Sequence, residues 1–222
     1  MKILTFDTST EIMYITLGNE SNVELCKVIE TTEKSYNTAH LIPTIIELLN
    51  EQNLTMQDIE AVGVNIGPGS FTGIRASAVV AKVMAQQLDI PIVGVSSMQI
   101  YSLLNTTGKD SLCLLDARRG KAYMAIYGEN TVEPCAIDYE KAVKFAQNKD
   151  LFVIADKKMS EILKESGLEC LNLTETKENL GLILAKLTSE ALKTNNPESL
   201  KWTDLKPLYI QPPPISMPKV MK

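Results

Sequence analysis

The sequence predicts an α/β protein of two small domains, on three observations. The apolar segments of residues 1–95 follow the order strand, strand, strand, helix, strand, helix, strand. A polar, turn-rich stretch at residues 105–109 then interrupts the pattern. A second series of strands and helices follows it. We therefore expect an N-terminal domain over residues 1–105 and a smaller C-terminal α/β domain with an extended tail over residues 106–222.

The first domain is expected to open with three strands in an antiparallel meander, because short polar turns separate three apolar segments. These segments are residues 2–6, 12–17 and 23–30. The elements expected after them are a helix from about Thr38, a strand at 61–66, a helix at 71–88 and a strand at 92–95. Ser96 and Ser97 can then cap a short helix that ends near residue 104.

The second domain is expected to begin with two strands joined by a hairpin or tight connection at residues 116–120. These strands are residues 111–115 and 121–127. The later elements expected are helices at 139–147, 159–165 and 178–193 and a strand at 151–155. The proline-rich end of the chain is expected to be extended.

Composition and charge exclude several classes of protein. With 45% hydrophobic and 22% charged residues the chain is globular in composition, and no apolar run approaches the roughly 18 residues of a membrane span. The four cysteines form no C-x-x-C pair, so neither a disulfide framework nor a zinc site is expected, and a reducing, cytoplasmic location fits. The net charge of −5 argues against a free-standing nucleic-acid binder, so RNA is expected to be reached through a partner.

The single histidine, His40, limits the catalytic chemistry that the chain can perform. H-E-x-x-H zinc sites are impossible, and any hydrolase that needs a histidine would have to use His40. On the helix from Thr38, His40 is expected on a polar side with Thr44, Glu47 and Glu51, opposite an apolar side. We therefore expect a solvent-exposed histidine without a catalytic role.

Two turns have the composition of phosphate-binding segments. The loop at residues 67–73 follows a strand and opens a helix, so its amides could hold an anion, or its glycines could only allow a tight turn and close packing. It has neither the P-loop lysine nor the dinucleotide spacing. Asp7, Thr8 and Ser9 could meet a magnesium-bound phosphate, or could form an ordinary hairpin turn.

In this order of strands and helices, the two turns resemble the first half of the actin, sugar-kinase and heat-shock ATPase superfold, in which nucleotide lies between two such domains. Five motifs narrow the resemblance to the TsaB (YeaZ) family. They are I-L-T-F-D-T-S-T at 3–10, G-P-G-S-F-T-G-I-R at 67–75, G-V-S-S at 94–97, L-D-A-R-R-G-K-A-Y at 115–123 and P-L-Y-I-Q-P-P at 207–213.

The resemblance implies a non-catalytic, scaffolding subunit. Members of this family support the transferase TsaD, together with the ATPase TsaE, in forming threonylcarbamoyladenosine beside the anticodon of bacterial tRNAs. Such a chain would form a homodimer alone, would reach tRNA only through the complex, and would need no cofactor.

The histidine and glycine content of the sequence agrees with a chain that has no catalytic site. TsaD holds its metal with a histidine pair, whereas His40 stands alone, so no metal site is expected. After Gly128 only Gly167 and Gly181 remain, so a second phosphate loop is missing. A degenerate nucleotide cleft is expected, with Asp7, Thr8, Ser9, Gly67 and Gly69 as its remaining residues. The alternative is a small ATPase or kinase that uses Asp7 and the loop at 67–73, or a peptidase, as distant relatives have been described.

The helix at 71–88 has an apolar arc too wide for one sheet, and small residues recur along it. Either the helix from Thr38 or a partner chain should cover its second side, and the family resemblance favours a partner. The predicted interface residues are Gly73, Ala76, Ser77, Val80, Ala81 and Met84.

The chain has only three arginines, Arg75, Arg118 and Arg119, and all lie in the two glycine-containing loops. They could contact a partner's acidic groups or RNA phosphate, or could form structural ion pairs. Arg119 and Lys121 stand at loop positions that vary within the family.

Overall fold

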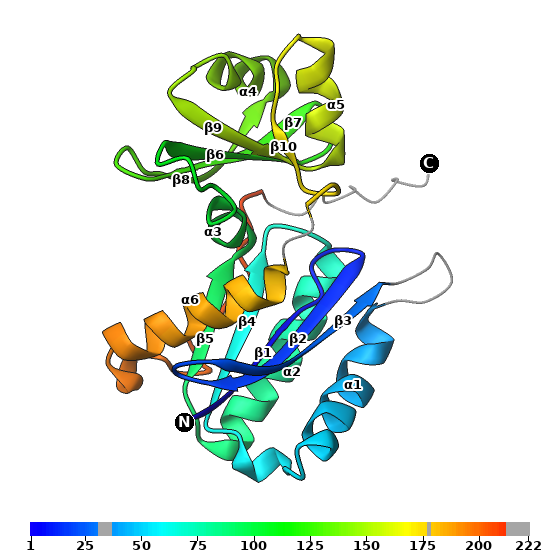
Figure 1. The fold of residues 1–222 in the computed structure, drawn as a ribbon, viewed down its shortest axis with the longest axis vertical. Helices are drawn as coiled ribbons and strands as arrows, with labels where there is room; N and C mark the ends of the chain where they lie inside the picture. Colours follow the sequence, from blue (N-terminus) through cyan, green and yellow to red (C-terminus); the bar gives the residue numbers. More distant parts are fainter. Residues whose placement is uncertain (31–36, 177–178, 212–222) are drawn as a thin grey trace, which may run out of the picture.

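A computed structural model describes residues 1–30, 37–176 and 179–211, which form two lobes, each built on a five-stranded mixed sheet (Figure 1). The first sheet has the order β3-β2-β1-β4-β5. Its strands are β1 (Lys2–Asp7), β2 (Ile12–Asn19), β3 (Val23–Glu30), β4 (Ala61–Gly67) and β5 (Ile92–Ser96). The first three strands form the expected antiparallel meander, and β1, β4 and β5 run parallel. The predicted α/β fold is confirmed.

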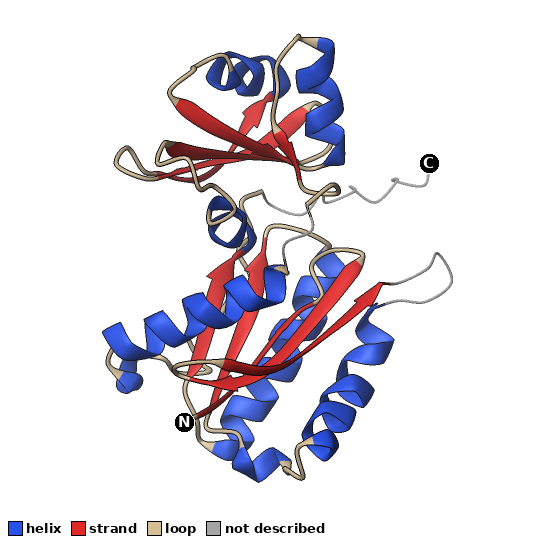
Figure 2. Ribbon diagram, viewed as in Figure 1, coloured by secondary structure: helices blue, strands red, loops and turns tan. Residues whose placement is uncertain are grey.

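Helices cover both faces of the first sheet (Figure 2). The helices α1 (Asn37–Glu51) and α2 (Phe71–Leu88) lie on one face, and α6 (Leu180–Thr194) lies on the other. The helix α1 is amphipathic, because Leu41, Ile45 and Leu48 recur at helical spacing and are buried. Thr44 was predicted on the polar side of α1, which is wrong, since its side chain is only 3% exposed and belongs to the buried face.

The second lobe repeats the strand order of the first. Its sheet runs β8-β7-β6-β9-β10, from edge to edge. The strands are β6 (Asp110–Asp116), β7 (Lys121–Tyr127), β8 (Val132–Asp138), β9 (Leu151–Ala155) and β10 (Leu171–Asn172). Sequence patterns missed two strands, β8 and β10. The strand β8 contains Pro134, and proline within a sheet is confined mainly to edge strands such as this one. The strand β10 has only two residues, too few to give a pattern.

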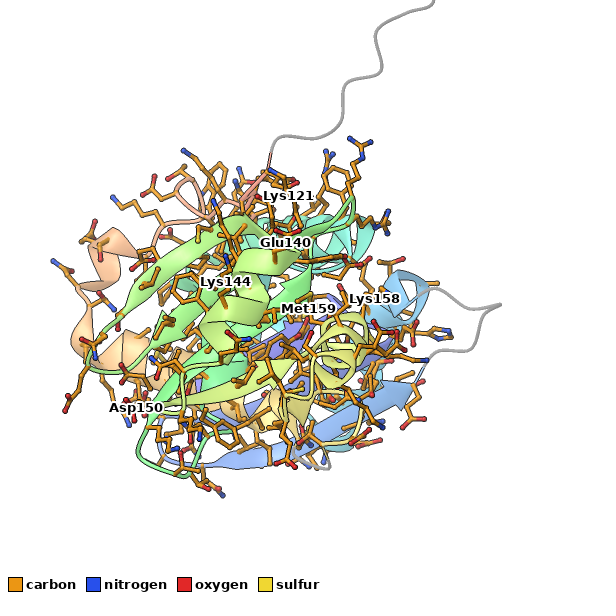
Figure 3. All side chains as sticks on the ribbon, turned by 90° about the horizontal axis from the view of Figure 1, so that it is seen from above. Lys121, Glu140, Lys144, Asp150, Lys158 and Met159 are labelled. Atoms are coloured by element: carbon orange, nitrogen blue, oxygen red, sulfur yellow. The ribbon has the colours of Figure 1, made fainter. Side chains whose placement is uncertain are left out.

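Two helices, α4 (Tyr139–Ala146) and α5 (Lys157–Glu165), cover the second sheet on the side facing away from the first lobe (Figure 3). The helix α5 begins two residues earlier than predicted, because the Asp156 carboxylate caps it by accepting a bond from the Met159 amide at 2.9 Å. The α6 helix begins at Leu180, where the Asn179 side chain accepts a bond from the Gly181 amide at 3.0 Å.

An apolar core joins the two lobes. It combines side chains from β5 and from α3 (Ser97–Ser102) with side chains from β6, β7, β9 and α6. Its buried members include Val95, Tyr101, Cys113, Ile154 and Leu184. The space between the two sheets is therefore filled by packed side chains at these positions.

The last described residues return to the first lobe. After the short helix η2 (Pro197–Ser199), the Leu200 carbonyl accepts a bond from the Ile92 amide at 3.0 Å, and the Leu208 amide donates to the Ile66 carbonyl at 2.8 Å. Leu205 is buried between these two points. The helix α6 and residues 200–208 come after residue 105 in the chain but pack on the first sheet. The predicted domain boundary near residue 105 stays a prediction. The end of the predicted tail, residues 212–222, lies outside the described residues.

Within the described residues, no helix combines the length and apolar character needed to cross a bilayer.

Candidate functional site

Polar side chains converge where the three parallel strands of the first sheet end. Asp7 ends β1, Asn65 lies near the end of β4, and Ser97 follows β5. The Asn65 amide nitrogen donates to the Asp7 carboxylate at 2.7 Å and to the Ser9 hydroxyl at 3.1 Å. The Asn65 oxygen accepts from the Ser97 hydroxyl at 2.8 Å and from the Gly67 amide at 2.7 Å. We refer to Asp7, Ser9, Asn65 and Ser97 as the polar centre.

The polar centre is closed to solvent and its hydrogen bonds are satisfied within the chain. Asp7 is 2% exposed, and each of its carboxylate oxygens accepts a bond, one from the Ser9 amide at 2.7 Å and one from Asn65. Burial raises the pKa of Asp7, although these bonds act in the opposite direction. Burial, and then the Asp7 charge, also raises the pKa of the neighbouring Tyr101 hydroxyl. The Asp7 carboxyl group is therefore buried with both of its oxygens hydrogen-bonded within the chain.

The glycine loop at residues 67–73 packs directly on the turn between β1 and β2. The Ser70 amide donates to the Ser9 carbonyl at 2.7 Å, and the Thr8 hydroxyl donates to the Gly73 carbonyl at 2.8 Å. A Cβ on Gly69 would lie 2.7 Å from the Ser9 carbonyl, and a Cβ on Gly73 would clash with the Thr8 carbonyl. The loop glycines are therefore needed for close packing.

Three loop amides that could have held a phosphate already have partners in the chain. The Gly67 amide donates to Asn65, the Ser70 amide to Ser9, and the Gly73 amide to the Ser70 hydroxyl at 3.3 Å. Nucleotide binding by Asp7, Thr8, Ser9, Gly67 and Gly69 therefore stays a prediction.

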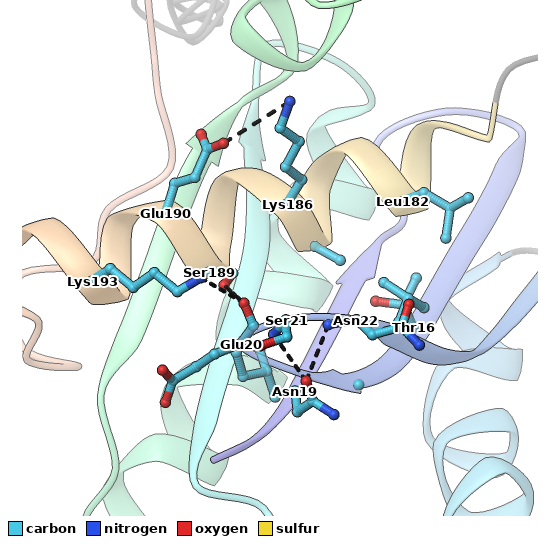
Figure 4. Close-up of a pocket in the computed structure, with 14 residues that line it drawn as sticks. Thr16, Asn19, Glu20, Ser21, Asn22, Leu182, Lys186, Ser189, Glu190 and Lys193 are labelled. Atoms are coloured by element: carbon cyan, nitrogen blue, oxygen red, sulfur yellow. Dashed lines mark hydrogen bonds and ion pairs between the residues drawn. The ribbon is translucent and has the colours of Figure 1, made fainter.

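Two hollows on the described surface lie away from the polar centre. One, of about 490 Å³, lies between α6 and the turn joining β2 to β3, where Ser189 and Lys193 donate to the Glu20 carbonyl at 2.8 and 2.7 Å (Figure 4). The other, of about 430 Å³, lies between the end of α3 and the strands β6 and β7. Neither is lined by a residue that the sequence predicted for a site.

Most of the predicted interface residues are buried in the chain itself. Gly73, Ser77, Ala81 and Met84 face the core, and Ala76 and Val80 are half-buried. The helix α1 packs beside α2, as one of the two sequence alternatives expected. Four large apolar side chains along these helices are about half exposed, and we refer to them as the α1–α2 ridge: Ile42 (50%), Ile46 (48%), Val79 (60%) and Val83 (51%). Phe71, at the start of α2, is also exposed and is not counted in the ridge. A helical wheel of residues 71–88 shows one wide apolar arc, so it could not tell which apolar side chains of α2 would be buried and which would be exposed.

The three arginines have different surroundings. Arg75 was predicted in a glycine-containing loop, which is wrong, since it lies in α2. Its guanidinium lies 5.2 Å from the centre of the Phe71 ring, which lies 5.9 Å from the Tyr209 ring. Arg118 and Arg119 are exposed in the turn between β6 and β7, with φ of 61° and 52°. Such left-handed conformations cost roughly 1–2 kcal/mol per residue with a side chain. In the part of the chain that the structure covers, the ion pairs use lysines and the N-terminus and no arginine.

His40 is exposed on α1, as expected. Among residues 1–30, 37–176 and 179–211, no three His, Cys, Asp or Glu side chains are grouped to hold a metal ion.

A family model described as TsaD: tRNA N6-adenosine threonylcarbamoyltransferase matches residues 31–202. The chain belongs to this family. Its relatives include the tRNA threonylcarbamoyladenosine biosynthesis protein TsaB of Bacillus subtilis (strain 168), 36% identical over 129 residues, and that of Escherichia coli (strain K12), 31% identical over 134 residues. Each alignment covers 57% of this chain and 55% of the relative, so the chain spans little more than half the length of these TsaB proteins.

Solved structures support the same fold. YeaZ from Pseudomonas aeruginosa superposes with a TM-score of 0.73 and 19% identity, covering 94% of this chain and 100% of YeaZ. A second protein from that organism, described as similar to peptidase YeaZ, gives a TM-score of 0.75 and 20% identity over 95% and 99% of the two chains. The resemblance of this TsaD-family chain to TsaB (YeaZ) is confirmed.

Asp7 and the glycine loop were predicted from the sequence as parts of one nucleotide site, and the structure brings the turn at Asp7 and the loop into contact. Asn65 and Ser97, which complete the polar centre, were not predicted. The available signal was Asn65 itself, the one polar side chain in the apolar strand A-V-G-V-N-I-G. A polar residue inside such a strand requires hydrogen-bond partners.

Proposed function

We propose that this chain is a non-catalytic subunit that a TsaD-type transferase and a TsaE-type ATPase require for threonylcarbamoylation of the adenosine next to the anticodon in tRNAs. Membership of the TsaD family and the TsaB names of its relatives support this role. On this proposal the chain acts in the cytoplasm, pairs with itself when alone, and meets tRNA only within the complex.

The observation that carries the non-catalytic role is the satisfied polar centre. A magnesium-bound nucleotide would need carboxylate oxygens and loop amides that can turn towards a ligand. Both oxygens of Asp7 accept protein donors, and the amides of Gly67, Ser70 and Gly73 donate within the chain. The apolar core between the lobes fills the neighbouring space. Nucleotide could enter only after these contacts were broken.

The surface proposed to meet the partner is the α1–α2 ridge with the half-buried Ala76 and Val80 beside it on α2. Four large apolar side chains, each about half exposed, occur as two pairs at helical i, i+4 spacing on neighbouring helices. Apolar surface of this kind is typical of an interaction site. The same face would serve the homodimer and the pairing with TsaD.

Reconstitution tests the proposed function. The transferase and the ATPase are incubated with tRNA, ATP and a pre-formed activated donor, threonylcarbamoyl adenylate, with or without this chain, and threonylcarbamoyladenosine is measured by mass spectrometry. We expect the modified nucleoside only when all three proteins are present, and no ATP turnover by this chain alone. Turnover by the isolated chain that Asp7→Ala abolishes would instead support the small ATPase or kinase.

A matched pair of variants tests the surface. Val79→Glu places a charge on the ridge, and Leu182→Glu places one on α6, where Leu182 is 43% exposed on the opposite side of the sheet. An unpaired carboxylate buried at an interface costs several kcal/mol, which lowers affinity more than a hundredfold. Sedimentation velocity should show lost association for Val79→Glu and unchanged association for Leu182→Glu. Equal association of both folded variants would place the interface elsewhere.

A further inference from the structure

The turn between β6 and β7 holds its backbone in an unusual conformation. Arg118, Arg119 and Gly120 have φ of 61°, 52° and 74°, so three consecutive residues are left-handed. Glycine and asparagine adopt this conformation readily, whereas arginine does so only at an energetic cost. The two arginines therefore occupy positions at which the backbone conformation favours glycine or asparagine. Such strain is often kept where a side chain is needed.

The backbone around the turn is fixed by hydrogen bonds that do not involve the two guanidinium groups. One oxygen of the Asp116 carboxylate accepts from the Arg118 amide and from the Tyr139 hydroxyl, each at 2.7 Å. The Lys121 amide donates to the Arg118 carbonyl at 3.1 Å, and the Tyr139 amide donates to the Gly120 carbonyl at 3.0 Å. The two arginine side chains are therefore presented from a rigid base.

Three cations project from this turn within four residues. Arg118, Arg119 and Lys121 are exposed, and none takes part in an ion pair with the described part of the chain. The nearest carboxylate in sequence, Asp116, uses one oxygen to accept from Tyr139 and from the Arg118 amide and forms no ion pair with either guanidinium, and Asp138 lies opposite Lys121 on β8 without pairing with it. We refer to Arg118, Arg119 and Lys121 as the cationic turn.

We propose that the cationic turn contacts backbone phosphates of tRNA when the chain stands in its complex. This inference rests on the proposed function and assigns to the chain a part in holding the substrate. The planar guanidinium fork matches phosphate oxygens, and phosphate contacts need charge and position without an apolar anchor.

An acidic protein partner fits the turn less well. Arginine is common at the centre of protein interfaces, but there it accompanies buried aromatic or apolar anchors, and lysine is depleted. The neighbours of the cationic turn in the chain are Ala117 and Gly120, which offer little apolar surface. The net charge of −5 also explains why the turn would add to RNA binding only after other subunits have brought tRNA close.

The test uses the whole complex and the salt dependence of its affinity for tRNA. The variant Arg118→Asn with Arg119→Asn removes both guanidinium groups and suits the left-handed backbone. The control, Lys141→Gln with Lys144→Gln, removes the same charge from exposed positions of α4; Lys144 lies over the sheet, apart from Lys121 at its rim (Figure 3). Filter binding is measured between about 50 and 300 mM salt.

Loss of two phosphate contacts should lower the slope of log affinity against log salt by about 1.4–1.8 units, while the control keeps the parental slope. The asparagine variant should also melt a few degrees above the parent, because the strain is relieved. If the asparagine variant keeps the parental slope of log affinity against log salt, the inference is overturned. If that slope is unchanged and the subunits no longer assemble, the turn contacts a protein instead of tRNA. If the parental complex itself fails to modify tRNA, the proposed function fails instead.

Discussion

Asp7 and Asp116 occupy equivalent positions in the two lobes. Each ends the central strand of a sheet with the same strand order, β1 in the first lobe and β6 in the second. Each carboxylate accepts a bond at 2.7 Å from the amide two residues later, Ser9 in one case and Arg118 in the other. The same local turn is closed over by the glycine loop in the first lobe and open to solvent in the second.

The difference shows that the surroundings, rather than the turn itself, decide what such an aspartate does. In the first lobe, Asn65 and the packed loop convert the carboxylate into part of the core. In the second lobe the aspartate stabilises a turn that exposes three cations. The hydrogen bonds of the Asp7 carboxylate are therefore satisfied within the chain, whereas the turn at Asp116 exposes positive charge at the surface.

The largest effect should come from breaking the polar centre. Asn65→Ala removes the donor to buried Asp7 together with the acceptor of Ser97 and Gly67. We expect the free energy of unfolding to fall by about 3–5 kcal/mol, because several buried polar groups lose their partner at once and each costs about 1–3 kcal/mol when unsatisfied. Urea denaturation measures this loss. The control is Asn130→Ala, since Asn130 donates to Asp110 in an exposed turn, and it should change stability little. Equal losses would contradict a structural polar centre.

A second comparison uses one glycine from each turn. A Cβ on Gly73 would meet the rigid Thr8 carbonyl, so Gly73→Ala should lower the free energy of unfolding by about 1–3 kcal/mol. Gly120 has open space around it but a φ of 74°, so Gly120→Ala should cost about 1 kcal/mol. Thermal unfolding ranks the two variants, and a larger loss for Gly120→Ala would mean that the loop does not pack as described.

Tyr139→Phe should have a smaller effect. It removes one hydrogen bond to the half-exposed Asp116 carboxylate, which water can replace, so we expect a loss of about 1 kcal/mol or less. The pKa of Tyr139, raised to about 12 by burial and then by Asp116, provides a spectroscopic check. Asp116→Asn should lower that pKa in an ultraviolet titration. An unchanged value would show that Asp116 does not face the hydroxyl.

Titration compares the two lobes with little disturbance to either. Burial raises the pKa of Asp7 above 3.8, so the stability linked to its protonated form is present below 3.8 and lost as the pH rises through the folded value. Bonds from Asn130 and Glu129 lower the pKa of Asp110 below 3.8, so its contribution is present above 3.8 and lost as the pH falls. Carboxyl ¹³C NMR should place the two midpoints on opposite sides of 3.8, and the reverse order would contradict both environments.

The sequence predicted the strands, helices and turns that depend on residues close together in the chain. The strand and helix order of the first lobe, the paired turns at Asp7 and at residues 67–73, and the exposed His40 were all expected and observed. The capping side chains Ser70 and Ser96 lie at helix starts that the sequence also predicted.

Features that depend on tertiary packing could not be predicted. Whether Val79 or Val80 faces outward depends on how α2 lies on its sheet and beside α1, and the exposed one is Val79. Pro134 concealed the edge strand β8 from the sequence pattern. One partner of the Asp7 carboxylate, Asn65, lies 58 residues away on another strand, so local patterns could not reveal it. The repeated strand order of the two lobes has no counterpart in a sequence repeat.

The most direct test of the account is the rate of tRNA modification by the reconstituted complex when the chain carries Asp7→Asn. If Asp7 is structural, the folded variant, checked by circular dichroism and sedimentation with the transferase, should support the same rate of threonylcarbamoyladenosine formation as the parent. A complex that assembles normally but loses modification in proportion to a lost ATP turnover would show that Asp7 takes part in catalysis, and would contradict the account.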